Sequence, residues 1–168
     1  MKAARLLLKV LAAVFVVGAA QAQTWPDRPI RVVNGFAAGG GTDLLLRAIQ
    51  PKLGEILGQQ LVIDYRPAAG GNLAMDTVAK ATPDGNTLLM GSPGLAINPS
   101  LYRELSFDPL RDFAPISLIG TVQNVLVVTP SLPVHSVAEL VALARKQPGK
   151  LNFASPGYGT SLHLSAEL

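Results

Sequence analysis

Two glycine-rich segments carry residue types that could bind an anion. The first is Gly39-Gly40-Gly41-Thr42-Asp43, which precedes a helical pattern, and the second is Gly157-Tyr158-Gly159-Thr160-Ser161. Backbone N–H groups at a helix N-terminus lack partners within the helix, and the helix dipole adds a partial positive charge there. Glycine lets a ligand approach that backbone closely. Each segment therefore predicts a binding position for a carboxylate or another small anion.

The two segments would bind one ligand together if they faced each other across a cleft. A ligand with a carboxylate at each end would suit such a pair. The alternative is that the glycines only form tight turns between a strand and a helix, which is the commoner reason for a single loop of this kind. Both segments also carry hydroxyl groups, on Thr42, Thr160 and Ser161. The explanation by tight turns alone is therefore less favoured here than for a single loop. Asp43 is expected to cap the helix and to keep the first loop in shape.

The motifs of well-known catalytic and nucleotide-binding loops are incomplete in this sequence. Gly157-Tyr158-Gly159 begins a dinucleotide fingerprint, but Leu162 stands where the third glycine belongs. The sequence contains neither the Gly-Lys-Ser/Thr step of a P-loop nor a Gly-x-Ser-x-Gly elbow. It has no cysteine and only two histidines, His135 and His163, and its carboxylates are not grouped. We therefore expect no catalytic residue, no metal and no cofactor; an exported α/β hydrolase that uses Ser92 and His163 is the alternative.

The basic residues do not predict a nucleic-acid partner. The formal net charge is +3, but three of the 14 lysines and arginines, Lys2, Arg5 and Lys9, lie at the N-terminus. The remaining basic residues equal the 11 acidic residues in number and are scattered along the chain. Binding to phosphates needs a clustered positive surface, which this pattern does not provide. Arg66 is the one cation on a candidate ligand loop, and we expect it to pair with Asp64 or another local acid.

Residues 1–22 have the features of a secretory signal peptide. A basic N-terminal region is followed by the apolar run Val10–Ala20 and by the cleavage pattern Ala20-Gln21-Ala22. The apolar run is too short for a membrane-spanning helix, so an N-terminal membrane anchor is the less favoured alternative. We expect the mature chain to begin near Gln23 and to be exported, which means the periplasm in a Gram-negative host.

The elements that would position the loops alternate between strand and helix. Apolar runs predict strands, helical spacing of leucine and isoleucine predicts helices, and turns rich in glycine and proline separate them. The expected strands are Ile30–Asn34, Leu61–Tyr65, Thr87–Met90, Ile116–Ile119, Asn124–Thr129 and Leu151–Ala154. The expected helices run from Thr42 or Asp43 to about Leu57, from Asn72 to about Lys80, from Ser136 to about Gln147, and from Ser161 to Leu168. Pro51 is expected to kink or break the first helix.

This alternation predicts an α/β domain with a mainly parallel sheet. Ligands of such sheets bind beyond the carboxyl ends of the strands. The turns at residues 35–41, 66–71 and 91–94 should therefore gather at that one edge. Residues 101–113 predict an irregular connection, and Val125–Val128 is expected to be a buried strand between two lobes.

Several motifs, taken in their order, resemble the Bug-type extracytoplasmic solute receptors of tripartite tricarboxylate transporters. The motifs are Trp25–Ile30, Phe36–Asp43, Arg66–Asn72, Ala81–Leu88, Pro148–Leu151 and Gly157–Leu164. Each motif is weak alone, but their order along the mature chain is specific. Tyr65 and Ala68 depart from the Asn and Gly that this family commonly has in its second turn.

The resemblance implies a periplasmic binding protein-like, Venus-flytrap fold with lobe one nearly complete and lobe two truncated, because the family's chains are much longer. The signal peptide would span residues 1–22, lobe one 23–124, and the hinge strand with the start of lobe two 125–168. A monomer would capture a di- or tricarboxylate-like organic acid between the lobes and deliver it to the membrane permease subunits. The implied ligand-binding residues are Ala38, Gly39, Gly40, Gly41, Thr42, Ser92, Gly157, Gly159, Thr160 and Ser161. A non-functional remnant of such a receptor is a further alternative.

Overall fold

The computed structural model describes residues 25–168, so the signal peptide expected at residues 1–22 lies outside the described residues. A three-stranded parallel sheet forms the centre, with β1 (Ile30–Asn34), β2 (Leu61–Tyr65) and β3 (Thr87–Met90) in the order β2-β1-β3. All three strands have the bounds that their apolar runs predict. Their parallel pairing confirms the expected α/β class.

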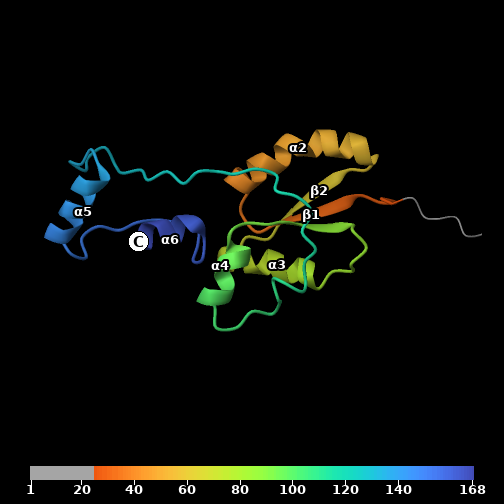
Figure 1. Ribbon diagram of the computed structural model, residues 1–168. Coiled ribbons are helices and arrows are strands. Elements are labelled where there is room, and N and C mark those ends of the chain that lie inside the picture. The colour runs from red at the N-terminus through yellow and green to blue at the C-terminus, as the bar shows by residue number, and fades with distance from the viewer. Residues whose placement is uncertain (1–24) are drawn as a thin grey trace, which may run out of the picture.

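Helices connect these strands and follow them along the chain. Their bounds are α2 (Gly41–Leu57), the 3-10 turn η1 (Ala69–Gly71), α3 (Asn72–Ala79), α4 (Gly94–Leu101), α5 (Val137–Lys146) and α6 (Ser161–Glu167). Figure 1 shows α2 on one face of the sheet and α3 on the other, whereas α5 lies away from both. The first crossover runs from β1 to β2, and the second runs back across β1 to β3. Because both crossovers are of the usual right-handed kind, their helices cover opposite faces of the sheet.

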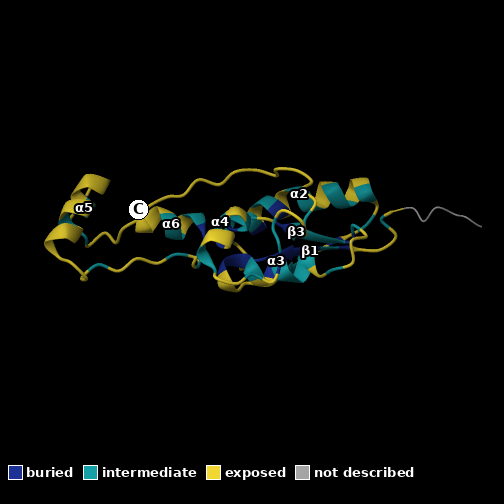
Figure 2. Cartoon of the chain, turned by 60° about the horizontal axis from the view of Figure 1, so that its bottom comes forward, coloured by how far each residue is buried: buried dark blue, intermediate teal, exposed yellow. Residues whose placement is uncertain are grey.

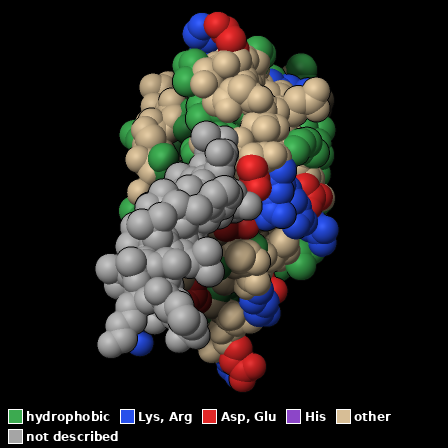
Figure 3. Space-filling view, turned by 90° about the vertical axis from the view of Figure 1, so that its right-hand side faces the viewer, with side chains coloured by type: hydrophobic (Ala, Val, Ile, Leu, Met, Phe, Trp, Pro, Cys, Tyr) green, Lys and Arg blue, Asp and Glu red, His purple; other side chains and the backbone are tan. Residues whose placement is uncertain are grey.

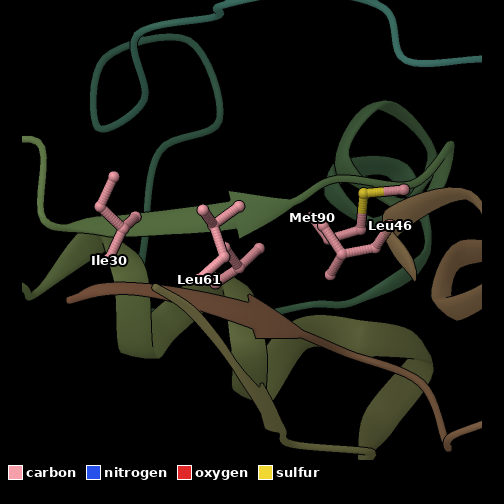
Figure 4. Packing of buried hydrophobic residues seen from close by; sticks show 5 residues of the cluster. Ile30, Leu46, Leu61 and Met90 are labelled. Atoms are coloured by element: carbon pink, nitrogen blue, oxygen red, sulfur yellow. The ribbon is translucent and has the colours of Figure 1, made fainter. Parts of the chain in front are cut away.

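The main hydrophobic core lies between α2 and the sheet. Its buried members are Ile30, Val32, Leu46, Leu61 and Met90. Figure 4 shows four of them in a row, from Ile30 through Leu61 to the adjoining side chains of Leu46 and Met90. Leucine and isoleucine side chains at helical spacing on α2 complete the contact. This packing fixes the position of the N-terminus of α2 relative to the carboxyl end of β1.

The sequence predicts a kink or a break at Pro51. The helix α2 continues through this residue, which excludes the break. Proline leaves the carbonyl of Arg47 without its helical partner. Both Pro51 and Arg47 are exposed, and water can therefore hydrate that carbonyl. The helix α4 was not predicted; it has only eight residues and contains Pro99. A proline inside so short a segment conceals its helical pattern.

The three strands expected after β3 are wrong. Residues 116–119, 124–129 and 151–154 have no regular secondary structure. A strand needs a neighbouring strand to pair with its backbone N–H and C=O groups, and the described residues provide no such neighbour for these segments. The expected irregular connection is present at residues 102–113, and the predicted capping box begins α5, where Ser136 Oγ accepts a hydrogen bond from Glu139 N (3.2 Å).

The Val125–Val128 segment is exposed, which contradicts its expected burial between two lobes. Val125 and Val127 are 74% and 80% exposed. Figure 2 shows the buried residues concentrated in the sheet and its two covering helices, while the long connection toward α5 is exposed. Ile116 and Leu118 on the same connection are also largely exposed. Among the described residues, the apolar run Val125–Val128 is therefore presented to solvent, with Ile116 and Leu118 on the same connection.

We expect this apolar segment to bind the hydrophobic dye ANS. Large exposed apolar patches are unusual on soluble monomers. The double substitution Val125→Lys and Val127→Lys should lower the dye fluorescence of the purified protein at least about twofold. The matched control is Gln123→Lys with Ser131→Lys, which adds the same charges without removing apolar surface. Equal losses in both double variants, or no dye binding by the wild type, would contradict this assignment.

Charged side chains of the described residues pair mainly with neighbours of opposite charge. On the face seen in Figure 3, basic and acidic groups lie beside one another. The ion pairs include Arg28–Asp84, Arg47–Asp43, Lys52–Glu55, Arg66–Asp64 and Lys80–Asp76. Among residues 25–168, no helix combines the length and the apolarity needed to cross a membrane.

Candidate ligand-binding site

The three turns that follow the strands lie together at the carboxyl end of the sheet, as predicted. A Cβ atom at Gly35 would lie 2.8 Å from Cα of Gly71, so the first and second turns are in close contact. A Cβ atom at Gly94 would lie 3.1 Å from the carbonyl oxygen of Gly70, so the third turn contacts the second. Figure 1 shows the N-terminal ends of α2, α4 and α6 at this same end of the sheet. The candidate site is therefore assembled from segments that are far apart in the sequence.

Asp43 stabilises the first glycine loop. Its carboxylate accepts hydrogen bonds from the Gly39 backbone N–H (2.7 Å), the Tyr65 hydroxyl (2.6 Å) and the Arg47 guanidinium (3.0 Å). Asp43 is 1% exposed. The Tyr65 hydrogen bond first, and then those from Gly39 and Arg47, lower the pKa of Asp43 to about 2. The carboxylate therefore stays charged at neutral pH and keeps the loop in shape, as predicted.

The expected helix cap is wrong in detail. Gly40 is the N-cap residue of α2, and no side chain caps it. Asp43 instead reaches back along the chain to Gly39, outside the helix. The backbone N–H groups of Gly41, Thr42 and Asp43 have no hydrogen-bond acceptor within residues 25–168. They are the orphan donors of the first helical turn.

Asn34, which was not among the predicted site residues, contacts the first loop from the strand side. Its Oδ1 atom accepts hydrogen bonds from Phe36 N (3.3 Å) and from Thr42 Oγ1 (3.0 Å). Asn34 is fully buried at the end of β1. A polar residue that ends an otherwise apolar strand was the available signal. Asn34 and Asp43 together fix the loop that carries the free N–H groups.

The predicted residues of the first loop differ in what they can offer a ligand. Gly39 is exposed, but its N–H already donates to Asp43. Gly40 N donates to the carbonyl of Ala37 over a longer 3.4 Å. Ala38 is exposed, while Gly41 and Thr42 are partly buried. The Thr42 hydroxyl donates to Asn34, so the backbone of Gly41 and Thr42 is the part left free for an anion.

The second and third turns offer fewer free groups. Arg66 Nε donates to Asp64 Oδ2 (3.2 Å), so Arg66 forms the local ion pair that the sequence analysis favoured. Asp64 also accepts from Arg31, and the two arginines lower its pKa. Ser92 Oγ accepts a hydrogen bond from Gly94 N (3.3 Å) and thereby stabilises the turn before α4.

The last glycine loop contacts the second turn and α4. The carbonyl oxygen of Tyr158 accepts a hydrogen bond from the Tyr102 hydroxyl (3.2 Å) and lies directly against Gly70. The rings of Tyr102 and Tyr158 pack edge to face with centroids 5.7 Å apart. Gly159 lies against the buried side chain of Asn98 on α4. The structure thus joins Gly157–Gly159 to the second turn, whereas the first loop contacts Val122 through Gly41.

The hydroxyl residues of the last loop have local partners. Thr160 Oγ1 donates to the carbonyl of Gly157 (2.8 Å) and accepts from His163 N (3.2 Å), so Thr160 caps α6. Ser161 Oγ is 3.4 Å from Asn124 Oδ1. His163 packs against the ring of Tyr158, and its Nε2 atom is 3.8 Å from Glu167. Ser92 and His163, the pair that a hydrolase would need, therefore each contact other groups.

Known proteins resemble this chain along most of its length. Residues 45–168 match the family described as Tripartite tricarboxylate transporter family receptor. The chain is 42% identical over 164 residues to a UPF0065 protein of Bordetella pertussis, and the match covers 96% of this chain and 50% of that protein.

Solved structures also resemble this chain over most of its length. The structure titled R. palustris Rpa4515 with adipate has a TM-score of 0.81 and 44% identity, covering 85% of this chain and 48% of that one. The periplasmic binding protein BugD has a TM-score of 0.73 and 31% identity, covering 84% of this chain and 48% of that one. The chain thus spans about half the length of the relatives it matches.

Proposed function

The chain belongs to the tripartite tricarboxylate transporter receptor family, and on that premise we propose that it is a periplasmic receptor for a small carboxylate. The observation that carries the proposal is the set of N–H groups at the N-terminus of α2 that have no acceptor within residues 25–168, on a loop that Asp43 and Asn34 fix from both sides. A carboxylate would accept hydrogen bonds from these N–H groups and would be attracted by the helix dipole. The similarity to the periplasmic binding protein BugD supports the periplasmic location, and cleavage of an export signal at residues 1–22 is part of the proposal.

The ligand of a solved relative supports a linear dicarboxylate as the ligand of this chain. Rpa4515 was solved with adipate, a linear dicarboxylate, and that protein is 44% identical to this chain. We therefore propose a dicarboxylate whose first carboxylate binds Gly41 and Thr42. Ala38, Gly39 and Gly40 would shape this wall, and Ser92 would border it.

The second carboxylate would contact the last loop in the proposed two-lobed arrangement. In this arrangement, residues 23–124 form one lobe, and residues 125–168 contribute the hinge segment and the beginning of the other. Gly157, Gly159, Thr160 and Ser161 would provide the second wall. Closure around the ligand would then create the form that the permease subunits of a tripartite transporter recognise.

Adipate should stabilise the purified protein against thermal unfolding. A ligand at a hundred times its Kd adds about 2.7 kcal/mol to the free energy of unfolding. For a domain of this size, that corresponds to a rise in melting temperature of about 5–10 °C. The control is adipamide, which has the same carbon skeleton without the charges and should leave the melting temperature unchanged. The absence of any shift across linear dicarboxylates from succinate to suberate would refute the proposal.

A further inference from the structure

Tyr65 links the second strand to the first glycine loop. It is the last residue of β2, and its hydroxyl donates to Asp43 Oδ1 (2.6 Å). The same hydroxyl accepts a hydrogen bond from Arg47 (2.7 Å), one turn further along α2. Arg47 in turn donates directly to both oxygens of Asp43. Tyr65, Asp43 and Arg47 thus form a closed hydrogen-bonded triangle behind the loop.

The triangle offsets the repulsion that would otherwise arise between Asp43 and a bound carboxylate. Asp43 lies in the first turn of α2, beside the N–H groups that would bind the carboxylate. Two negative charges so close together repel each other strongly in a partly buried site. Arg47 supplies the compensating charge, and Tyr65 supplies a donor that keeps the Asp43 carboxylate turned toward β2. The other oxygen of Asp43 can then hold the Gly39 backbone N–H, and the site keeps its affinity for an anion.

The position of Tyr65 at the end of β2 explains why it acts on a loop that is distant from it in the sequence. Tyr65 pairs with Asn34 in the parallel register of β1 and β2, so the two side chains that support the first loop stand on adjacent strand ends. Tyr65 therefore acts on the loop before α2 rather than on the turn at residues 66–71 that follows it in the sequence.

We propose that Tyr65 is a positioning residue of the anion site, which it serves by orienting the Asp43 carboxylate behind the first glycine loop. This inference rests on the proposed function, because it concerns the affinity for the carboxylate ligand. Two consequences follow from the geometry. Removing the hydroxyl alone should weaken ligand binding, and it should also change the protonation of Asp43, since the Tyr65 hydrogen bond is the largest influence on that carboxyl.

The test compares Tyr65→Phe with the wild type by calorimetric titration with adipate and by NMR of the Gly39 amide. Tyr65→Phe should raise the Kd for adipate about fivefold or more. The Gly39 amide signal reports protonation of Asp43, and its acid midpoint should rise from about 2 toward the ordinary 3.8. Arg47→Met should weaken binding in the same direction. Lys52→Met removes a cation from the exposed Lys52–Glu55 pair on the same helix and should leave both readings unchanged.

The outcomes separate the inference from the proposed function. If the wild type binds adipate and Tyr65→Phe binds it within twofold of the same Kd, the inference is overturned and the proposed function stands. A weakened affinity without any change in the Gly39 midpoint also overturns it, because the effect would not then pass through Asp43. If the wild type binds none of the dicarboxylates, the proposed function fails and the inference fails with it. Weaker binding of adipate by Tyr65→Phe, together with a higher acid midpoint of the Gly39 amide, supports the inference.

Discussion

Asp43→Asn is expected to lower the melting temperature by about 5 °C or more at neutral pH. The Asp43 carboxylate accepts hydrogen bonds from Gly39, Tyr65 and Arg47. Asparagine has the same shape but only one acceptor oxygen, and its amide NH₂ would face donors. A buried donor left without an acceptor destabilises the folded state. Glu55→Gln, in an exposed pair on the same helix, is the control and should change the melting temperature by about 1 °C at most.

The loss caused by Asp43→Asn should depend on pH in a defined direction. The pKa of Asp43 is lowered to about 2 from its ordinary 3.8. A lowered folded-state pKa contributes stability above the unfolded value, and this contribution is lost as the pH falls through the folded value. The difference in melting temperature between wild type and variant should therefore be full above pH 5 and should shrink below about pH 4. If the melting temperatures of wild type and variant, measured by calorimetry, differ by the same amount down to pH 3, the role assigned to the Asp43 charge is contradicted.

Gly70→Ala is expected to separate the last glycine loop from the second turn. Gly70 has φ +62°, and a Cβ atom there would overlap the carbonyl oxygen of Tyr158. The left-handed backbone costs an alanine about 1–2 kcal/mol, and overpacking at the contact adds about 1–3 kcal/mol. The Tyr102–Tyr158 hydrogen bond should also be lost. Urea unfolding should therefore show a loss of about 3 kcal/mol in the free energy of unfolding.

Gly58→Ala is the matched control for this substitution. Gly58 has φ +66°, close to that of Gly70, but no atom lies within 4 Å of its Cβ position. It should therefore show only the backbone cost of about 1–2 kcal/mol. Hydrogen exchange at the Thr160 amide should accelerate in the Gly70 variant and not in the Gly58 variant. Equal losses of stability in the two variants would mean that the contact between Gly70 and Tyr158 contributes nothing.

The strands that the sequence predicts correctly are those whose partners also lie in the described chain. Ile30–Asn34, Leu61–Tyr65 and Thr87–Met90 are short apolar runs bounded by turn residues, and each pairs with another of the three. Val125–Val128 has the same local character but forms no strand and is exposed. Local sequence indicates which segments can be strands, whereas the presence of a pairing partner decides which of them are.

In the candidate site, too, the sequence predicts arrangements that depend on neighbouring residues better than contacts between distant segments. The gathering of the glycine turns follows from the alternation of strands and helices, and the link from Asp43 to the loop spans only four residues. Tyr65 was missed because its role depends on the register between β1 and β2, which places its strand end beside the first loop. Asn34 was missed although its partners, Phe36 and Thr42, lie close to it in the sequence. The position of the last loop against Gly70 depends on contacts across more than fifty residues, such as Tyr102 with Tyr158. No spacing rule predicts a contact of that kind.

An NMR titration of the ¹⁵N-labelled protein with adipate tests the central claim most directly. The amide signals of Gly41, Thr42 and Asp43 should shift in a saturable manner, because the N–H groups of Gly41 and Thr42 bind the carboxylate and that of Asp43 lies beside them. Gly58, at the opposite end of α2, should not shift, and adipamide should produce no change. Saturable binding that leaves these three amides unmoved would place the ligand elsewhere, and the absence of any shift would contradict carboxylate binding by this protein.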